Sequence, residues 1–145
     1  MERRNFLNVT LGALALAAVP ASVKAEDYRK TRPAVWSAHT VDDAIKAMYG
    51  STDLVMEGVS LTAPKVASNG GAIPVDFSCD KDIKSIAVFQ DANPEAAVCA
   101  ITTNKYSIKI KMGKSGAITV VAEGTDGKLY AAKQALDVAL GGCEG

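Results

Sequence analysis

The sequence contains very few of the residues that build catalytic and metal centres. His39 is the only histidine among 145 residues, and no histidines or carboxylates stand in pairs at metal-ligand spacing. A serine–histidine–aspartate arrangement would have to use His39, which precedes the predicted β region. No glycine-rich phosphate-binding loop is present. The sequence therefore predicts a protein that is not an enzyme and that binds no metal or cofactor.

An excess of charge is also missing. The chain carries 16 lysines and arginines against 16 aspartates and glutamates, so its formal net charge is zero. Proteins that bind nucleic acid usually display a clear positive excess. The composition therefore gives no reason to expect a nucleic-acid partner, and the length is that of a single domain.

The N-terminus has the features of an export signal. Arg3 and Arg4 are followed by a spacer residue and an apolar pair, a pattern that resembles the twin-arginine motif. The apolar run over residues 9–21 is shorter than the roughly 20 residues of a membrane-spanning helix. Val23 and Ala25 fit a cleavage site. We predict that residues 1–25 are a twin-arginine signal peptide, that the mature protein is periplasmic, and that it does not associate with the membrane.

The mature chain is predicted to begin with a linker and a short helix. Residues 26–38 are charged and contain a proline, which is typical of an irregular linker. The segment from residue 40 to residue 49 has helical spacing of its apolar residues. Thr40 is a candidate N-cap, with Asp43 in the first turn, and Gly50 is a stop signal. A domain over residues 39–140 is therefore expected to start with a helix.

The remainder of the domain indicates short strands separated by turns. Apolar and polar residues alternate clearly within several of these strands, as expected of strands with one buried face. Strand patterns occupy residues 59–62, 73–79, 83–90, 97–103, 106–112 and 117–124. Residues 128–140 are ambiguous, because alanine and leucine favour a helix whereas the alternation at the end favours a strand. About seven short strands predict a mainly β fold, an antiparallel β-sandwich.

Three cysteines follow the predicted signal peptide. In an oxidising compartment an odd number suggests one disulfide and one remaining thiol. Cys79 and Cys99 are predicted to form a disulfide between neighbouring strands. Two alternatives remain open for this pair, namely two buried apolar thiols or a redox-active pair.

Cys143 differs from the other two because it lies three residues from the C-terminus. Gly141, Gly142 and Gly145 give the segment over residues 141–145 wide backbone freedom, which predicts a flexible arm. Glu144 and the terminal carboxylate disfavour the thiolate of Cys143. The thiol therefore suits an attachment point whose chemistry is supplied by another protein. The alternative is a secreted binding or assembly module that dimerises through a Cys143 disulfide.

Several segments, taken in order, resemble the SoxY family of sulfur-oxidation carrier proteins. The ending "GGCEG" is similar to the family's "GGCGG" terminus, and the twin-arginine start also fits the family. The resemblance covers roughly residues 40–145. Further similar segments are VSLTAPKVASNGGAIPV at 59–75, the Asn-Pro turn at 93–94, IKMG at 110–113 and DGKLY at 126–130.

The resemblance implies an immunoglobulin-like β-sandwich that forms a heterodimer with a SoxZ-like subunit lacking an export signal of its own. It also implies that Cys143 carries sulfur intermediates covalently during thiosulfate oxidation. The implied partner enzymes are a c-type cytochrome complex that conjugates thiosulfate, a dimanganese sulfohydrolase and, where present, a sulfane dehydrogenase. The sequence departs from the family pattern at Glu144, which stands where the family has glycine, and at Cys79 and Cys99.

Overall fold

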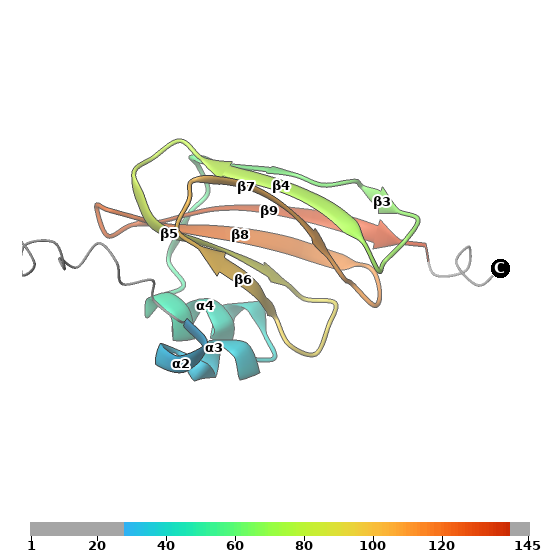
Figure 1. The fold of residues 1–145 in the computed structure, drawn as a ribbon, viewed down its shortest axis with the longest axis horizontal. Coiled ribbons are helices and arrows are strands. Elements are labelled where there is room, and N and C mark those ends of the chain that lie inside the picture. The colour runs from blue at the N-terminus through green and yellow to red at the C-terminus, as the bar shows by residue number, and fades with distance from the viewer. Residues whose placement is uncertain (1–27, 140–145) are drawn as a thin grey trace, which may run out of the picture.

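The computed structural model of the protein describes residues 28–139 and shows, within them, three short helices followed by nine strands (Figure 1). The helices are α2 (Tyr28–Thr31), α3 (Pro33–Ser37) and α4 (Val41–Tyr49). The strands are β1 (Leu54–Val55), β2 (Val59–Thr62), β3 (Val66–Ala67), β4 (Ile73–Cys79), β5 (Ile83–Gln90), β6 (Ala97–Ile101), β7 (Lys105–Ile110), β8 (Gly116–Gly124) and β9 (Leu129–Val138).

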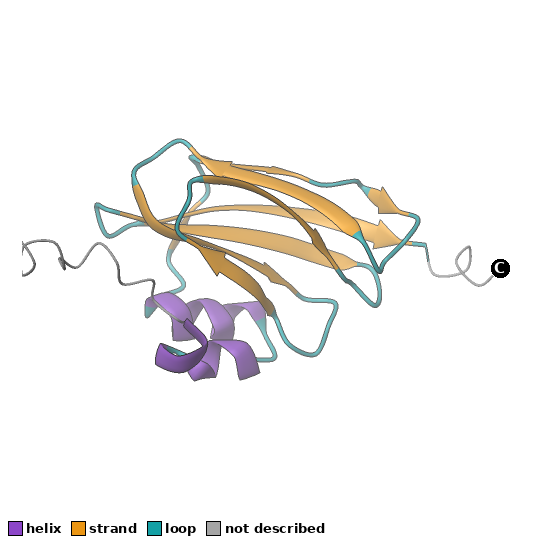
Figure 2. Cartoon of the chain, in the orientation of Figure 1, coloured by secondary structure: helices purple, strands orange, loops and turns teal. Residues whose placement is uncertain are grey.

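The strands form two sheets that pack face to face (Figure 2). The large sheet has the order β1-β9-β8-β5-β6, and β3 pairs with the far end of β9. The small sheet has the order β2-β4-β7. The predicted antiparallel, immunoglobulin-like β-sandwich is confirmed. The two-residue strands β1 and β3, which the sequence pattern did not reveal, add parallel pairings to β9.

Alternating residues of the strands fill the space between the sheets. On β4, Ile73, Val75 and Phe77 are buried, whereas Pro74 and Asp76 between them are exposed. The large sheet supplies the facing side chains, mainly from β5, β8 and β9. Because successive side chains of a strand point to opposite faces, the alternation in the sequence determined which face of β4 turned inward.

A second apolar cluster lies on the outer face of the large sheet. Ile45 and Met48 of α4 pack there against Phe89 of β5 and Val121 of β8. Thr40 caps this helix, since its hydroxyl accepts a hydrogen bond of 3.1 Å from the backbone N–H of Asp43. The central strands β5 and β8 are thus covered on both faces, which explains their long apolar runs.

Residues 28–38 differ from the irregular linker that the sequence predicted. They form the turns of α2 and α3, and the side chain of Val35 is fully buried in the outer cluster. Arg32 donates a hydrogen bond to the carbonyl of Met48, which ties this segment to the end of α4. Burial of one apolar side chain and this long-range bond order the segment, and neither is visible in local sequence.

The ambiguous segment near the C-terminus is a strand, β9, from Leu129 to Val138. β9 pairs with β8 from Gly116 opposite Leu136 to Glu123 opposite Leu129. Cross-strand pairing of this extent outweighs the helix propensity of its alanines, because propensity is a weak preference. Within residues 28–139, no helix has the length and apolar character required to cross a bilayer.

The turn between β8 and β9 is closed by a carboxylate. Asp126 accepts a hydrogen bond of 2.5 Å from the Tyr130 hydroxyl and a second from the backbone N–H of Lys128. The bond from Tyr130 is the main reason that the pKa of Asp126 lies below its usual value. The same bond, together with burial, raises the pKa of Tyr130 to about 12.

We expect stability to fall at high pH because of Tyr130. A group with a raised pKa in the folded state contributes stability below its unfolded pKa, near 10 for tyrosine, and loses it as the pH rises toward about 12. Tyr130→Phe should remove this part of the alkaline loss, whereas Tyr106→Phe, at a 51% exposed site, should not. Urea unfolding between pH values of about 9 and 12 measures the difference, and equal alkaline losses in all three proteins would contradict it.

The packing of the N-terminal turns predicts a stability contribution from Val35. Val35→Ala removes two buried methyl groups and should lower the free energy of unfolding by about 2 kcal/mol. Ser37→Ala in the same helix alters an exposed side chain and should change it by less than about 0.5 kcal/mol. Urea denaturation measures both, and an unchanged midpoint for Val35→Ala would show that residues 28–38 do not pack on the domain.

Candidate functional site

The predicted attachment residue Cys143 and the glycines Gly141, Gly142 and Gly145 lie outside the described residues. The structure instead describes the place from which they leave the domain. This place is the end of β9, and Ala139 is its last described residue. Figure 1 shows it at the end of the sandwich opposite the β8–β9 turn. We call it the arm end.

Hydrogen bonds hold the chain firmly up to the arm end. On one side, the backbone N–H of Ala139 donates to Ala67 at 2.9 Å, and that of Asp137 donates to Lys65 at 2.9 Å. On the other side, the N–H of Val138 donates to the hydroxyl of Ser115 at 2.8 Å. The segment that follows Ala139 therefore starts from a fixed point. Cys143, four residues further on, reaches at most about 14 Å from it.

The loops around the arm end are joined to one another by side-chain amides. The Gln90 side chain, 1% exposed, accepts from the backbone N–H groups of Ala92 and Asn93 and donates to the carbonyl of Glu95. Asn93 in turn donates to the carbonyl of Lys111 and accepts from the N–H of Gly113. These bonds hold the loop after β5 against the loop between β7 and β8.

A groove opens directly beside Ala139. It encloses about 360 Å³ and is lined by the turn over residues 69–71, by residues 111–113 and by Ala139 itself. Glycine is required at position 70, because a Cβ atom there would lie 2.5 Å from the carbonyl oxygen of Met112 and 2.9 Å from the Val138 side chain. The turn can therefore close tightly on the end of β9.

The remaining two cysteines lie in different sheets, which overturns the expected disulfide between neighbouring strands. Cys79 ends β4 in the small sheet, and Cys99 lies on β6 at the edge of the large sheet. Both thiols are free. Both side chains belong to the apolar core between the sheets, Cys79 fully buried and Cys99 partly so. The pair therefore matches the alternative of two buried apolar thiols.

Burial also makes the Cys99 thiol unreactive. Desolvation raises the pKa of Cys99 to about 11, although a backbone hydrogen bond at Val88 offsets part of the rise. At neutral pH this thiol stays protonated, and the thiolate is the reactive form. The structure thus gives no support to a redox-active pair formed by Cys79 and Cys99.

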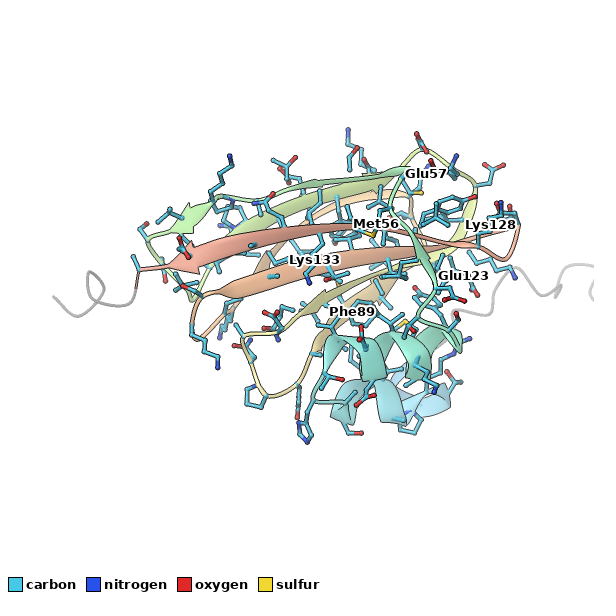
Figure 3. The ribbon with its side chains drawn as sticks, turned by 180° about the vertical axis from the view of Figure 1, so that it is seen from behind. Met56, Glu57, Phe89, Glu123, Lys128 and Lys133 are labelled. Atoms are coloured by element: carbon cyan, nitrogen blue, oxygen red, sulfur yellow. The ribbon has the colours of Figure 1, made fainter. Side chains whose placement is uncertain are left out.

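His39 has a structural role in the described chain. Its Nδ1 atom donates a hydrogen bond of 2.9 Å to the carbonyl of Pro94, which links the start of α4 to the loop after β5. It also borders a cleft of about 420 Å³ on the outer face of the large sheet. Figure 3 shows Met56 and Lys133, two further residues of that cleft, near β9 on this face. Among residues 28–139, no group of three histidine, cysteine or acidic side chains is placed to hold a metal ion.

The family model of the sulfur oxidation protein SoxY matches residues 45–143. The chain belongs to the SoxY family. The match includes the sandwich from α4 to β9 and extends to Cys143. Membership also makes it a sulfur-oxidation carrier protein, in a family of carriers that work with partners of the Sox pathway, such as SoxZ.

Solved structures agree with this assignment. The sulfur carrier protein SoxY from Chlorobium limicola f thiosulfatophilum superposes with a TM-score of 0.62 at 28% identity, covering 69% of this chain and 96% of that chain. The T24K variant of superoxide reductase (neelaredoxin) from Ignicoccus hospitalis has a TM-score of 0.52 at 13% identity, covering 57% of this chain and 81% of that chain. The second likeness concerns the fold alone. Curated protein sequences yielded no significant match.

Sequence reasoning missed the features that build the arm end. Gln90 and Asn93 looked like ordinary residues of a turn, and their partners lie up to 20 residues away in the chain. β3 has only two residues and gave no strand pattern. The one local signal was the pair of glycines at 70–71, which predicted a turn but not its contact with β9.

The burial of two thiols predicts selective modification. Treatment of the folded protein with iodoacetamide at neutral pH should alkylate Cys143 and leave Cys79 and Cys99 unmodified, because Cys79 is buried in the core and desolvation suppresses the thiolate of Cys99. Mass spectrometry of peptides measures this, and alkylation after unfolding in urea is the control that shows all three to be modifiable. A disulfide-linked peptide containing Cys79 and Cys99 would contradict the structure.

Proposed function

We propose that the protein carries sulfur intermediates covalently on the thiol of Cys143 and presents them to the enzymes of a Sox pathway. The observation that carries this proposal is that the SoxY family match runs from the helix before the sandwich as far as residue 143. The sandwich then serves as the rigid support of the carrier, and residues 141–145 serve as its arm.

The geometry of the arm end supports this role. A carrier arm must start from a fixed point, so that the enzyme that binds the sandwich can find the thiol within a short distance. Hydrogen bonds to β3 and to Ser115 supply this point at the end of β9. The short reach, about 14 Å from Ala139 to Cys143, suits insertion into a pocket of a docked partner.

The proposed loading step is an oxidation. The Cys143 thiolate and thiosulfate form a sulfur–sulfur bond, and the two electrons released pass to a c-type cytochrome complex, which is the oxidant. Water then attacks the terminal sulfonate in a dimanganese hydrolase, which releases sulfate and two protons and leaves a persulfide on Cys143. A sulfane dehydrogenase, where present, oxidises the remaining sulfur. The carrier itself contributes the thiol and its placement, and no catalytic group.

The proposal includes a partner and a compartment. A SoxZ-like subunit without an export signal would form a heterodimer with this chain, and the twin-arginine signal over residues 1–25 would export the folded pair to the periplasm. This route explains why a chain with no predicted cofactor would use a pathway for folded proteins.

Mass spectrometry of the protein isolated from cells grown on thiosulfate tests the carrier function. We expect mass additions on the peptide that contains Cys143, corresponding to sulfur and to sulfonated sulfur. These additions should disappear in Cys143→Ser and persist in the matched variant Cys99→Ser, whose thiol lies in the core.

Two outcomes would contradict the proposal. Adducts that persist in Cys143→Ser would place the cargo elsewhere. A stable disulfide dimer as the main form of the active protein on non-reducing gels would instead support the assembly module that dimerises through Cys143.

A further inference from the structure

The groove beside Ala139 has an apolar floor and one cationic wall. The Met112 side chain is 1% exposed and closes the floor, and the glycines of the two turns leave room above it. Lys111 is exposed and borders the groove on one side. It also borders a second hollow, which contains Glu95, on the other side. Lys114 lies in the same loop, and Asp137 lies on the adjoining strand.

The C-terminal segment is attached at the mouth of this groove. Ala139 is one of its lining residues, and six residues follow in the chain. The first of them, Leu140, is apolar. The fifth is Glu144, whose Cα atom lies at most about 17 Å from that of Ala139. A ligand tethered this closely has an effective concentration in the millimolar range, so weak contacts suffice for partial occupancy.

The chemistry of the segment complements the groove. Leu140 matches the apolar floor at Met112, and the carboxylate of Glu144 matches the ammonium of Lys111. Within residues 28–139 Lys111 forms no ion pair, although Glu95 borders the same hollow. A lysine at the rim is thus available to an acidic group that arrives from the arm.

We propose that the groove binds the protein's own C-terminal segment, residues 140–145, with Leu140 on the apolar floor and the Glu144 carboxylate at Lys111. Gly141 and Gly142 lie between the two contacts and allow the chain to turn back. The docked arm holds Cys143 close to the domain, and the released arm extends it.

This contact would regulate access to the carrier thiol. The regulatory role rests on the proposed function, whereas the contact between the arm and the groove does not. Exposed ion pairs are weak. The docked and extended arms are therefore expected to differ in population by only a few-fold, and a partner enzyme displaces the arm easily. Glu144 thereby acquires a role that glycine at this position would not have.

Amide resonances of the isotope-labelled mature protein test the contact directly. Glu144→Gln should shift the resonances of Gly70, Gly71 and Gly113, although Glu144 is five residues beyond the last described position. The matched control Glu123→Gln removes the same charge at the opposite end of the sandwich and should leave these resonances in place. Lys111→Gln should shift the same resonances. Lys109→Gln, two residues earlier in the chain, should not.

The reactivity of Cys143 provides a second measurement. The rate constant of its thiolate with iodoacetamide, taken from the pH dependence of alkylation, should rise about two- to fivefold in Lys111→Gln and in Leu140→Ser, the range expected for loss of a weak contact. The charge-swapped protein, Lys111→Glu with Glu144→Lys, should return toward the wild-type rate. Added salt should narrow the difference between the wild type and Lys111→Gln.

Unshifted groove resonances in Glu144→Gln, together with alkylation rates equal to that of Lys109→Gln, would overturn the docked arm. That result leaves sulfur adducts on Cys143 unaffected, so the carrier function would stand. Conversely, the groove resonances could shift while the protein isolated from thiosulfate-grown cells carries no sulfur adducts. That result would support the contact and reject the carrier function.

Discussion

The pairing of β9 on both of its edges is the interaction on which the rest of the molecule depends. Along one edge it follows β8 for most of its length, and at the far end the other edge is closed by β3. A strand end is normally a place where a chain frays. Here backbone bonds continue to Ala139. The described chain is thereby held in place as far as Ala139.

A fixed boundary requires a stiff sheet, and the two apolar clusters supply it. β5 and β8 lie between the inner core and the cluster under α4, so bending either strand would open packed surfaces on both faces. Interiors packed at this density resist deformation. The helices at the N-terminus therefore affect the arm end indirectly, because they complete the second cover of the sheet that contains β9.

Local sequence determined the elements and left their arrangement open. The alternation within β4, the capped helix at Thr40 and the turn signals were all visible, because each depends on residues a few positions apart. The free thiols of Cys79 and Cys99 were not visible. Their separation depends on which sheet each strand joins, and strands of similar pattern can join either sheet. The same reason hid β1 and β3, whose pairing comes entirely from β9.

The three cysteines fall into two groups. Cys79 and Cys99 have a structural role in the core, whereas Cys143 is proposed to have a chemical role. Cys79 and Cys99 pack in the sandwich core, and desolvation favours the protonated form of Cys99. Cys143 follows the last strand in the sequence, next to Glu144, and is the predicted attachment residue. Under the proposed function, a thiol without activation of its own would react slowly in solution, and the selectivity of loading would come from a partner pocket that supplies a positive charge or a base. Under the same proposal, a short arm would matter more than a reactive thiol, since the partner would bring its own chemistry within reach of the sandwich. The loops joined by Gln90 and Asn93 lie near the end of β9, and their internal hydrogen bonds hold them in place.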